Sequence, residues 1–360
     1  MFKSGREASN FYQHYEYTAI SNVVSKYYNV GANWVNITAV IFYSSALIAF
    51  YPMLHCLQKY GLQTTTYLAF FVNAIGPCIK CFALRKSLYW LILFGQLFPA
   101  LANISQPCLT TIFAANWFES EEVAFVISTN SISLALGSSI AFLSPTLFFG
   151  NVTNDEEMFN GLSFLSTTLA LVTSILFVIA VLLIKEKPPT PPSMAEKNRE
   201  DHLQNRSFRV LLKNRNFILL AIIFSLVTAV SQTLSVVLNQ SIFLQFSHAN
   251  HIVTIAGLLS LIPGIISSPL TGLICKRYKR YKRLHIIYSL LMIIFLGFYI
   301  LSLNLKCKAW IYISVFFAGF FFSGIYVIVM DFVIEVTYPY PESVTKKCTD
   351  LRRTMRQLIY

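Results

Sequence analysis

The sequence predicts an all-α polytopic membrane protein whose helices form two bundles. Hydrophobic residues make up 55% of the 360-residue chain and charged residues only 12%, whereas soluble domains carry roughly 25% charged residues. The apolar residues form long runs, and a helix needs about 20 such residues to cross the hydrocarbon of a bilayer. One long polar segment, residues 185–215, divides these runs into two sets. Composition and pattern together exclude a soluble globular protein.

The apolar runs predict nine complete transmembrane helices. Five precede the polar segment and four follow it, near residues 34–56, 63–84, 88–114, 122–148, 162–184, 216–243, 251–275, 285–304 and 309–335. Residues 1–30 contain no such run. They are aromatic and polar, so we expect only a short amphipathic helix there.

The polar segment is predicted to be a cytoplasmic linker. Its four closely spaced prolines favour extended chain over a helix, and they stand at positions 188, 189, 191 and 192. The predicted domains are an N-terminal bundle (1–184, with its first helix incomplete), the linker (185–215), a C-terminal bundle (216–338) and a cytoplasmic tail (339–360).

Lysine and arginine residues set the expected orientation. With the linker in the cytoplasm, the inner segments hold twenty of these residues and the outer segments five, Lys80 among the five. This bias is typical of membrane topology. The net charge of +12 is spread over short blocks between the spans, so it favours contact with anionic lipid over binding of nucleic acid. Asn151 begins an Asn-Val-Thr sequon in an outer loop, where glycosylation is expected.

The number of spans suggests that helices are missing at both ends. A cytoplasmic linker after five complete spans puts the beginning of the first span outside. One more helix at the amino end, of which Tyr12–Tyr28 would be the outer half, would complete a bundle of six. The tail after Pro339 stops where another pair of helices could follow. We therefore expect a six-plus-six arrangement that is truncated at both ends.

Four short segments carry a resemblance to a known family. They are Leu57–Leu62 (LQKYGL), the GQL and NWF triplets that start at Gly95 and Asn116, Lys185–Pro189 (KEKPP) and Asp331–Pro339 (DFVIEVTYP). In order and spacing they resemble the feline leukaemia virus subgroup C receptor-related family of the major facilitator superfamily, whose members are heme, choline and ethanolamine transporters. The resemblance implies a two-bundle facilitator fold and transport of a small organic solute by alternating access. Choline or ethanolamine is the first expectation and heme the second.

A rival hypothesis comes from the apparent truncation. Family members continue into an eleventh and a twelfth helix, so the chain could instead be a non-transporting membrane protein that acts as a regulatory partner or decoy.

Polar residues inside apolar spans are the candidate substrate contacts, because buried polar groups are costly in lipid. Gln232 and Asn239 lie on roughly one face of the seventh helix, and Asn103 lies on the proline-interrupted fourth helix. Hydrogen bonding between helices is the alternative interpretation of the two residues on the seventh helix. Tyr17 is a candidate through the family resemblance, which places a tyrosine near this position at the cavity and an aromatic residue near His14.

Charged residues near the inner helix ends are candidates for a gate. Asp331 and Glu335 are four residues apart on one helix and match family carboxylates. They could gate the pathway, couple transport to protons or form ion pairs with the basic residues 276–283, and the ion pair is the first expectation. The segment from Gly272 to Arg280 resembles a facilitator loop motif in which an aspartate–arginine pair latches the cytoplasmic gate. Arg277 matches the arginine, and Lys276 replaces the aspartate.

Other classes of function find no support in the sequence. It contains no Walker loop, nucleophile elbow or metal-ligand spacing, so neither an enzyme nor a cofactor or metal site is expected. The expected partners are a small-molecule substrate and the lipid bilayer, and the expected location is the plasma membrane.

Overall fold

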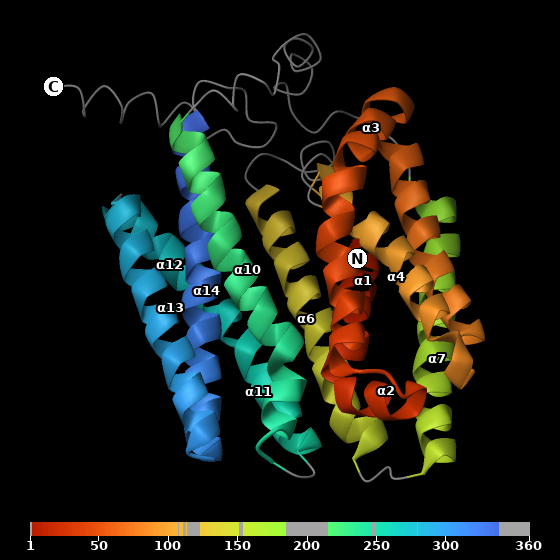
Figure 1. Ribbon diagram of the computed structural model, residues 1–360. Coiled ribbons are helices and arrows are strands. Elements are labelled where there is room, and N and C mark those ends of the chain that lie inside the picture. Colours follow the sequence, from red (N-terminus) through yellow and green to blue (C-terminus); the bar gives the residue numbers. More distant parts are fainter. Residues whose placement is uncertain are drawn as a thin grey trace, which may run out of the picture.

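The computed structural model shows two bundles of long helices that lie side by side (Figure 1). The described residues are 2–106, 108–110, 113, 123–150, 154–184, 215–246, 249–278 and 280–337. Every secondary-structure element among them is a helix, which confirms the predicted fold class. We call the end where α7 stops and α10 begins the linker end, and the opposite end the distal end.

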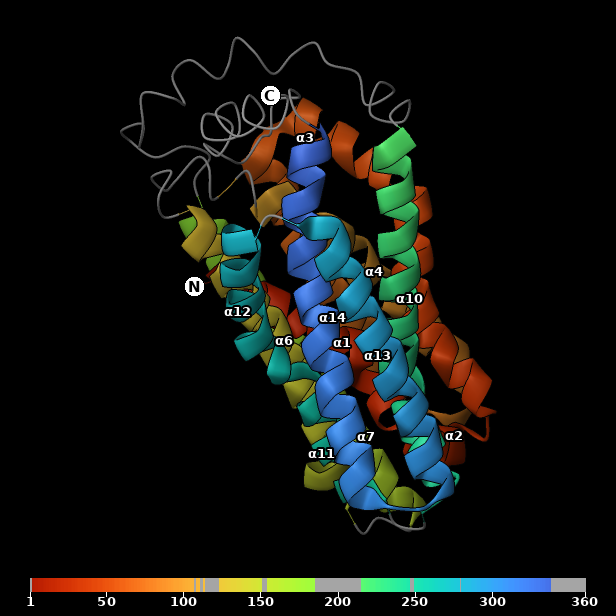
Figure 2. The same cartoon turned by 90° about the vertical axis from the view of Figure 1, so that its left-hand side faces the viewer.

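The N-terminal bundle contains the helices up to residue 183. Its elements are α1 (Phe2–Ala19), α2 (Ser21–Tyr28), α3 (Ala32–Phe82), the short 3-10 helix η1 (Lys86–Leu88), α4 (Tyr89–Ile104), α6 (Val123–Phe149) and α7 (Asp155–Leu183). The C-terminal bundle is built from α10 (Arg215–Phe243), α11 (Asn250–Leu261), α12 (Pro263–Tyr278), α13 (Tyr281–Asn304) and α14 (Lys308–Thr337). The view turned by 90° shows α13 and α14 running side by side over most of their length (Figure 2).

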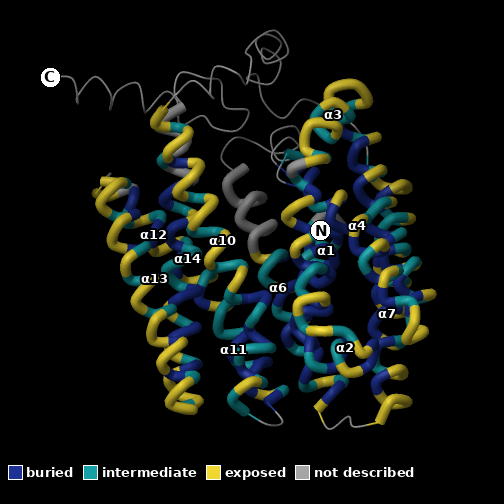
Figure 3. Tube along the Cα trace, in the orientation of Figure 1, coloured by how far each residue is buried: buried dark blue, intermediate teal, exposed yellow. Residues whose placement is uncertain are grey.

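Most of the predicted spans coincide with these helices. Eight stretches of the described chain are long and apolar enough to cross a membrane: 48–82, 86–110, 132–149, 155–183, 215–243, 250–275, 281–304 and 308–329. Large apolar side chains are exposed along their outer faces, as expected where lipid is the solvent, and the buried residues gather on the inner sides (Figure 3). The protein is therefore a multi-pass membrane protein.

A sharp bend divides α3 into two passes. Gly61 has φ 77° and ψ −179° inside the otherwise continuous helix. Glycine adopts positive φ without the steric cost that a Cβ atom adds. The bend lies at the linker end (Figure 1) and falls between the predicted spans 34–56 and 63–84, so it serves as the connection between them.

The amino-terminal segment differs from the prediction. Residues 2–19 form one helix of 18 residues, roughly 27 Å long at 1.5 Å per residue, and not a short amphipathic piece. Tyr12–Tyr28 is not the outer half of one helix either, because the axis breaks at Ile20 and α2 lies across the distal end (Figure 1). Hydropathy missed α1 because its polar side chains, including Arg6 and Glu16, are buried against protein and not exposed to lipid.

Close backbone contact holds α1 against α6. A Cβ atom added at Gly137 of α6 would lie 2.0 Å from the carbonyl oxygen of Ala8. We expect Gly137→Ala to lower the free energy of unfolding by about 1–3 kcal/mol, the usual cost of overpacking. Thermal unfolding of the purified protein in detergent measures this. Gly297→Ala on α13 is the matched control, since a Cβ there meets nothing within 4 Å; equal melting temperatures for the two variants would contradict the prediction.

Candidate substrate site between the two bundles

Helix α1 lies between the N-terminal bundle and the C-terminal bundle. It packs against α3, α4, α6 and α7 on its own side and against α10 across the interface. Its polar residues fall into two sets. One set forms hydrogen bonds and ion pairs inside the N-terminal bundle, and the other contacts α10. A solute that passes between the bundles would meet the second set.

Aromatic rings surround His14 on the interface side of α1. The imidazole is stacked on the rings of Tyr15 (centroids 4.5 Å apart) and Phe42 (4.6 Å), and the ring of Tyr43 meets it edge-on at 5.0 Å. His14 is buried, and neither of its nitrogen atoms has a hydrogen-bond partner among the described residues. Tyr43, in contrast, is 40% exposed. The rings therefore form a group that is closed on one side and open at Tyr43.

A hydrogen bond from this aromatic group reaches α10. The hydroxyl of Tyr15 donates to Oε1 of Gln232 at 2.5 Å. Gln232 is half-buried, and its amide nitrogen has no hydrogen-bond acceptor among the described residues. Gln232 was predicted to line the cavity, and the structure places it at the boundary between the bundles, beside a ring that belongs to α1.

Further toward the distal end, amide side chains join the two bundles. Asn239 of α10 donates through Nδ2 to the carbonyl oxygen of Ala19 (2.7 Å) and to Oδ1 of Asn22 (3.0 Å), and its Oδ1 accepts from the backbone N–H of Asn22 (3.2 Å). Gln240 donates to Oδ1 of Asn36 (2.7 Å), and Asn36 donates back to Oε1 of Gln240 (3.2 Å). We call Asn22, Asn36, Asn239 and Gln240 the amide clasp.

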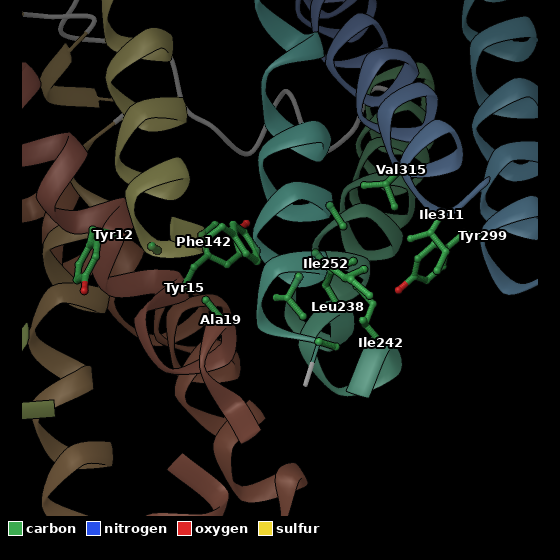
Figure 4. Packing of buried hydrophobic residues seen from close by; sticks show 14 of the residues in the cluster. Tyr12, Tyr15, Ala19, Phe142, Leu238, Ile242, Ile252, Tyr299, Ile311 and Val315 are labelled. Atoms are coloured by element: carbon green, nitrogen blue, oxygen red, sulfur yellow. The ribbon is translucent and has the colours of Figure 1, made fainter. Parts of the chain in front are cut away.

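An apolar cluster reinforces the same region of the interface (Figure 4). From the N-terminal bundle it contains Tyr12, Tyr15, Ala19 and Phe142, and from the C-terminal bundle it contains Leu238, Ile242, Ile252, Tyr299, Ile311 and Val315, among others. Thr146 of α6 and Thr254 of α11 are also joined by a hydrogen bond of 2.8 Å. The distal half of the interface is therefore closed by apolar packing and by hydrogen bonds.

The linker half of α10 has a different environment. Ala221, Ile222 and Ile223 are consecutive residues and all exposed, as are Ser225 and Leu226 in the next turn. Because neighbouring residues point about 100° apart on a helix, this exposure covers more than the single face that lipid would contact. The bundles are thus joined at the distal end, whereas the described linker half of α10 is exposed on more than one face.

Tyr17 does not lie at the contact between α1 and α10. It is buried inside the N-terminal bundle, in an apolar cluster with Leu162 and Leu165, and the ammonium of Lys80 lies 5.2 Å from its ring centroid. A substrate contact at Tyr17 stays a prediction, while Tyr15, two residues earlier, is the residue whose hydroxyl reaches α10. The helical rotation between positions 15 and 17 accounts for the difference.

Lys80 requires a correction. It was counted among the charges of the outer loops, but its Nζ is buried and lies 2.8 Å from Oε2 of Glu16, which is buried as well. A second buried pair joins Arg6 and Glu7 at 3.7 Å, and Thr110 donates to Glu7 at 2.9 Å. The carboxylates of α1 thus have cationic partners within the N-terminal bundle.

An amide network inside the N-terminal bundle was largely missed by the sequence analysis. Oδ1 of Asn73 accepts from Nδ2 of Asn10 (2.7 Å) and Nε2 of Gln13 (3.3 Å), and Gln96 donates to the carbonyl oxygen of Gln13 (2.6 Å). The signal that could have found it is the helical spacing of Arg6, Asn10 and Gln13, which lie on one face of α1.

The remaining predicted site residues have less definite surroundings. Asn103 is half-buried near the end of α4. Arg277 is exposed at the end of α12, with its guanidinium 5.8 Å from the ring of Tyr278. Asp331 and Glu335 lie within α14, but their side chains, like the sequon residue Asn151, fall outside the described part of the structure. Their roles in gating and glycosylation stay predictions.

The sequence matches a protein-family model and several curated proteins. A family model described as "Major Facilitator Superfamily" matches residues 15–358. The chain is 26% identical over 344 residues to the choline/ethanolamine transporter FLVCR2 of Rattus norvegicus, across 93% of this chain and 62% of the rat protein. It is 27% identical over 346 residues to the choline/ethanolamine transporter FLVCR1 of Felis catus, across 92% of this chain and 60% of the cat protein. These relatives agree with the resemblance carried by the four sequence segments.

A nematode relative and two solved structures extend the comparison. The uncharacterized MFS-type transporter C09D4.1 of Caenorhabditis elegans is 27% identical over 350 residues, across 96% of this chain and 59% of that protein. The chain thus spans about 60% of the length of these curated relatives. The xylose transporter XylE from E. coli, in a partially occluded inward open conformation, matches with a TM-score of 0.70 and 12% identity, across 93% of this chain and 87% of XylE. An inward-facing bacterial homolog of the human lysosomal transporter Spinster matches with a TM-score of 0.64 and 13% identity, across 93% of this chain and 78% of that one.

Proposed function

Because the chain belongs to the Major Facilitator Superfamily, we propose that it carries a small organic cation of the choline or ethanolamine class across the membrane by alternating access. The two bundles would rock about a site at their interface. In this proposal the linker lies in the cytoplasm, the distal end faces outside, and the protein resides in the plasma membrane. With the distal end closed by packing and hydrogen bonds and the linker half of α10 exposed, the structure would correspond to an inward-facing state.

The observation that carries the proposal is the junction of Tyr15 and Gln232 beside the rings around His14. A quaternary or primary ammonium group is attracted to aromatic faces within about 6 Å, and an amide can bond to the hydroxyl group of the same solute. The names of the rat and cat relatives point to the same class of solute. Tyr43, the exposed member of the ring group, would be the first ring that a solute meets from the linker end.

The distribution of acidic residues favours recognition by aromatic rings. The sequence contains no aspartate or glutamate between residues 202 and 330, so α10 to α13 offer a cation no carboxylate. In α1, Glu16 is paired with Lys80 and Glu7 lies beside Arg6. A cationic solute at this interface would therefore depend on ring faces and neutral oxygen atoms.

The proposal is tested by uptake of labelled choline into cells that express the chain, with the surface amount measured in parallel. We expect uptake above that of control cells, and Gln232→Ala should reduce it about threefold to tenfold, the value of one hydrogen bond of about 0.5–1.5 kcal/mol. Tyr15→Phe keeps the ring and removes the hydroxyl, so it separates ring stacking from hydrogen bonding. Thr233→Ala is the control, because Thr233 is exposed and bonds within its own helix.

Two outcomes would contradict the proposal. Equal uptake by Gln232→Ala and Thr233→Ala would show that the substrate site does not lie at the Tyr15–Gln232 junction. Normal surface amounts without uptake of choline or ethanolamine would leave heme transport, or the non-transporting role, as the better hypothesis.

A further inference from the structure

A dense group of basic residues occupies the turn between α12 and α13. Residues 276–283 read KRYKRYKR, six cations in eight residues. Helix α12 ends at Tyr278 and α13 begins at Tyr281, so the cations stand at the adjoining ends of two helices. Four of them have described, exposed side chains, and we call these four the basic turn: Arg277, Arg280, Lys282 and Arg283.

The basic turn is held in place by packing on both sides. Cys275, just before it, is fully buried. The ring of Tyr281 stacks on Phe332 of α14, with centroids 5.7 Å apart and planes 13° from parallel. Tyr278 is 60% exposed beside Arg277. The cations are therefore presented outward from two anchored helix ends, at the linker end of the C-terminal bundle.

The chain supplies too little negative charge to balance these cations. The nearest acidic residues in the sequence are Asp201 and, on α14, Asp331 and Glu335. If both α14 carboxylates pair with basic residues of 276–283, four of these six cations still have no carboxylate partner from the C-terminal bundle. The linker offers no surplus, because residues 185–215 hold eight basic and four acidic residues.

The helix ends add to this imbalance. The first turn of α13 contains no acidic residue, and Lys282 and Arg283 lie in it. The free N–H groups of a helix start already carry partial positive charge, so cations there are unfavourable unless an anion is present. The arrangement is thus suited to a negatively charged ligand from outside the chain.

We propose that the basic turn binds the phosphorylated headgroup of an inositol phospholipid in the cytoplasmic leaflet. The turn follows directly on a membrane span, at the level of the headgroups, where clusters of four or more basic residues attract anionic lipids. One headgroup with several phosphate charges matches several cations in one turn better than single-charge lipids do. Arginine forks bond phosphate in a bidentate manner, and the exposed ring of Tyr278 suits the interfacial region. The proposal rests on the cytoplasmic orientation of the linker given above, but not on the identity of the transported solute.

The test compares lipid binding to the full chain in nanodiscs of phosphatidylcholine. One set contains phosphatidylinositol 4,5-bisphosphate, and the other contains phosphatidylserine at the same total lipid charge; bound lipid is counted by native mass spectrometry. The variant is Arg280→Gln/Lys282→Gln. The matched control is Lys306→Gln/Lys308→Gln, which also removes two exposed cations, but at the distal end.

We expect the wild type and the control to retain the inositol lipid. The basic-turn variant should bind it with at least about tenfold lower affinity, because each juxtamembrane cation contributes a few-fold in affinity. Equal binding by the variant and the control would overturn the proposal. Equal retention of phosphatidylserine at matched charge would overturn the choice of a multivalent headgroup. Melting temperatures of the two variants show whether a loss of binding reflects unfolding. The measurement uses no transported solute, so a failure of the transport proposal leaves its outcome unaffected.

Discussion

Replacing Glu16 by alanine is expected to prevent most of the chain from reaching a folded state. The substitution leaves the Lys80 ammonium buried in the N-terminal bundle without its partner at 2.8 Å. Breaking a buried ion pair from one side costs about 3–5 kcal/mol, which is a large share of the roughly 5–15 kcal/mol that stabilises a typical protein. The amount of monodisperse protein after detergent extraction, and the amount at the cell surface, are the measurements.

The double substitution Glu16→Gln/Lys80→Gln separates charge from packing. Because it removes both charges and keeps hydrogen-bonding side chains of similar length, we expect it to recover much of the folded protein. The Lys86–Asp155 pair at the distal end provides the control, since both side chains are more than half exposed. Asp155→Asn should change stability by less than about 1 kcal/mol. Full folding of Glu16→Ala would show that the buried pair does not hold α1 in the bundle.

The spans after residue 30 could be predicted because apolar length alone identifies them. The outer faces of α7, α10 and α13 expose large apolar side chains, as a helix in lipid requires over about 20 residues. Gly61 was visible as a glycine between two runs, and its positive φ explains why the chain can turn there within one or two residues.

Helix α1 could not be recognised in the same way, because hydropathy measures contact with lipid and α1 contacts protein. Its side chains meet partners far along the chain: Asn10 meets Asn73, and Glu16 meets Lys80. Sequence alone shows a polar segment, and the partners that make its burial favourable are known only from the fold. For the same reason Lys80 was predicted in an outer loop, whereas in the structure it lies in the interior beside Glu16.

The candidate site was predicted in part. Polar residues of α10 were identified from their position in an apolar run, and Gln232 and Asn239 do lie at the interface with α1. Their height along α10 decides which of them would contact a solute and which would join the bundles. That assignment depends on where α1 lies beside α10, which the sequence does not give. Tyr17 was named through the family resemblance and its role stays a prediction; that Tyr15 is the tyrosine bonded to α10 could be seen only in the fold.

Substitutions in the amide clasp are the second group with a large expected effect. We expect Asn239→Ala/Gln240→Ala to open the distal end, because the clasp bonds join the bundles only while that end is closed. If the double substitution removes two net hydrogen bonds of about 1 kcal/mol each, the equilibrium shifts about 30-fold toward the state that is open at the distal end. Ligand-free proteins of this kind exchange between such states, so a change in their relative energy changes their populations.

Accessibility of a buried position reports this shift. Ala249 is fully buried in the apolar cluster at the distal end, and Ala249→Cys can be labelled by a membrane-impermeant maleimide only when that end opens. The same chains without this cysteine give the background from native thiols. Ser241→Ala is the matched control: Ser241 neighbours the clasp on α10, but its hydroxyl bonds to Tyr299 inside the C-terminal bundle, at 2.6 Å. Faster labelling in the clasp variant, with the control unchanged, would identify the clasp as the outer gate. Equal labelling rates in all three chains would mean that the apolar cluster closes the distal end without it.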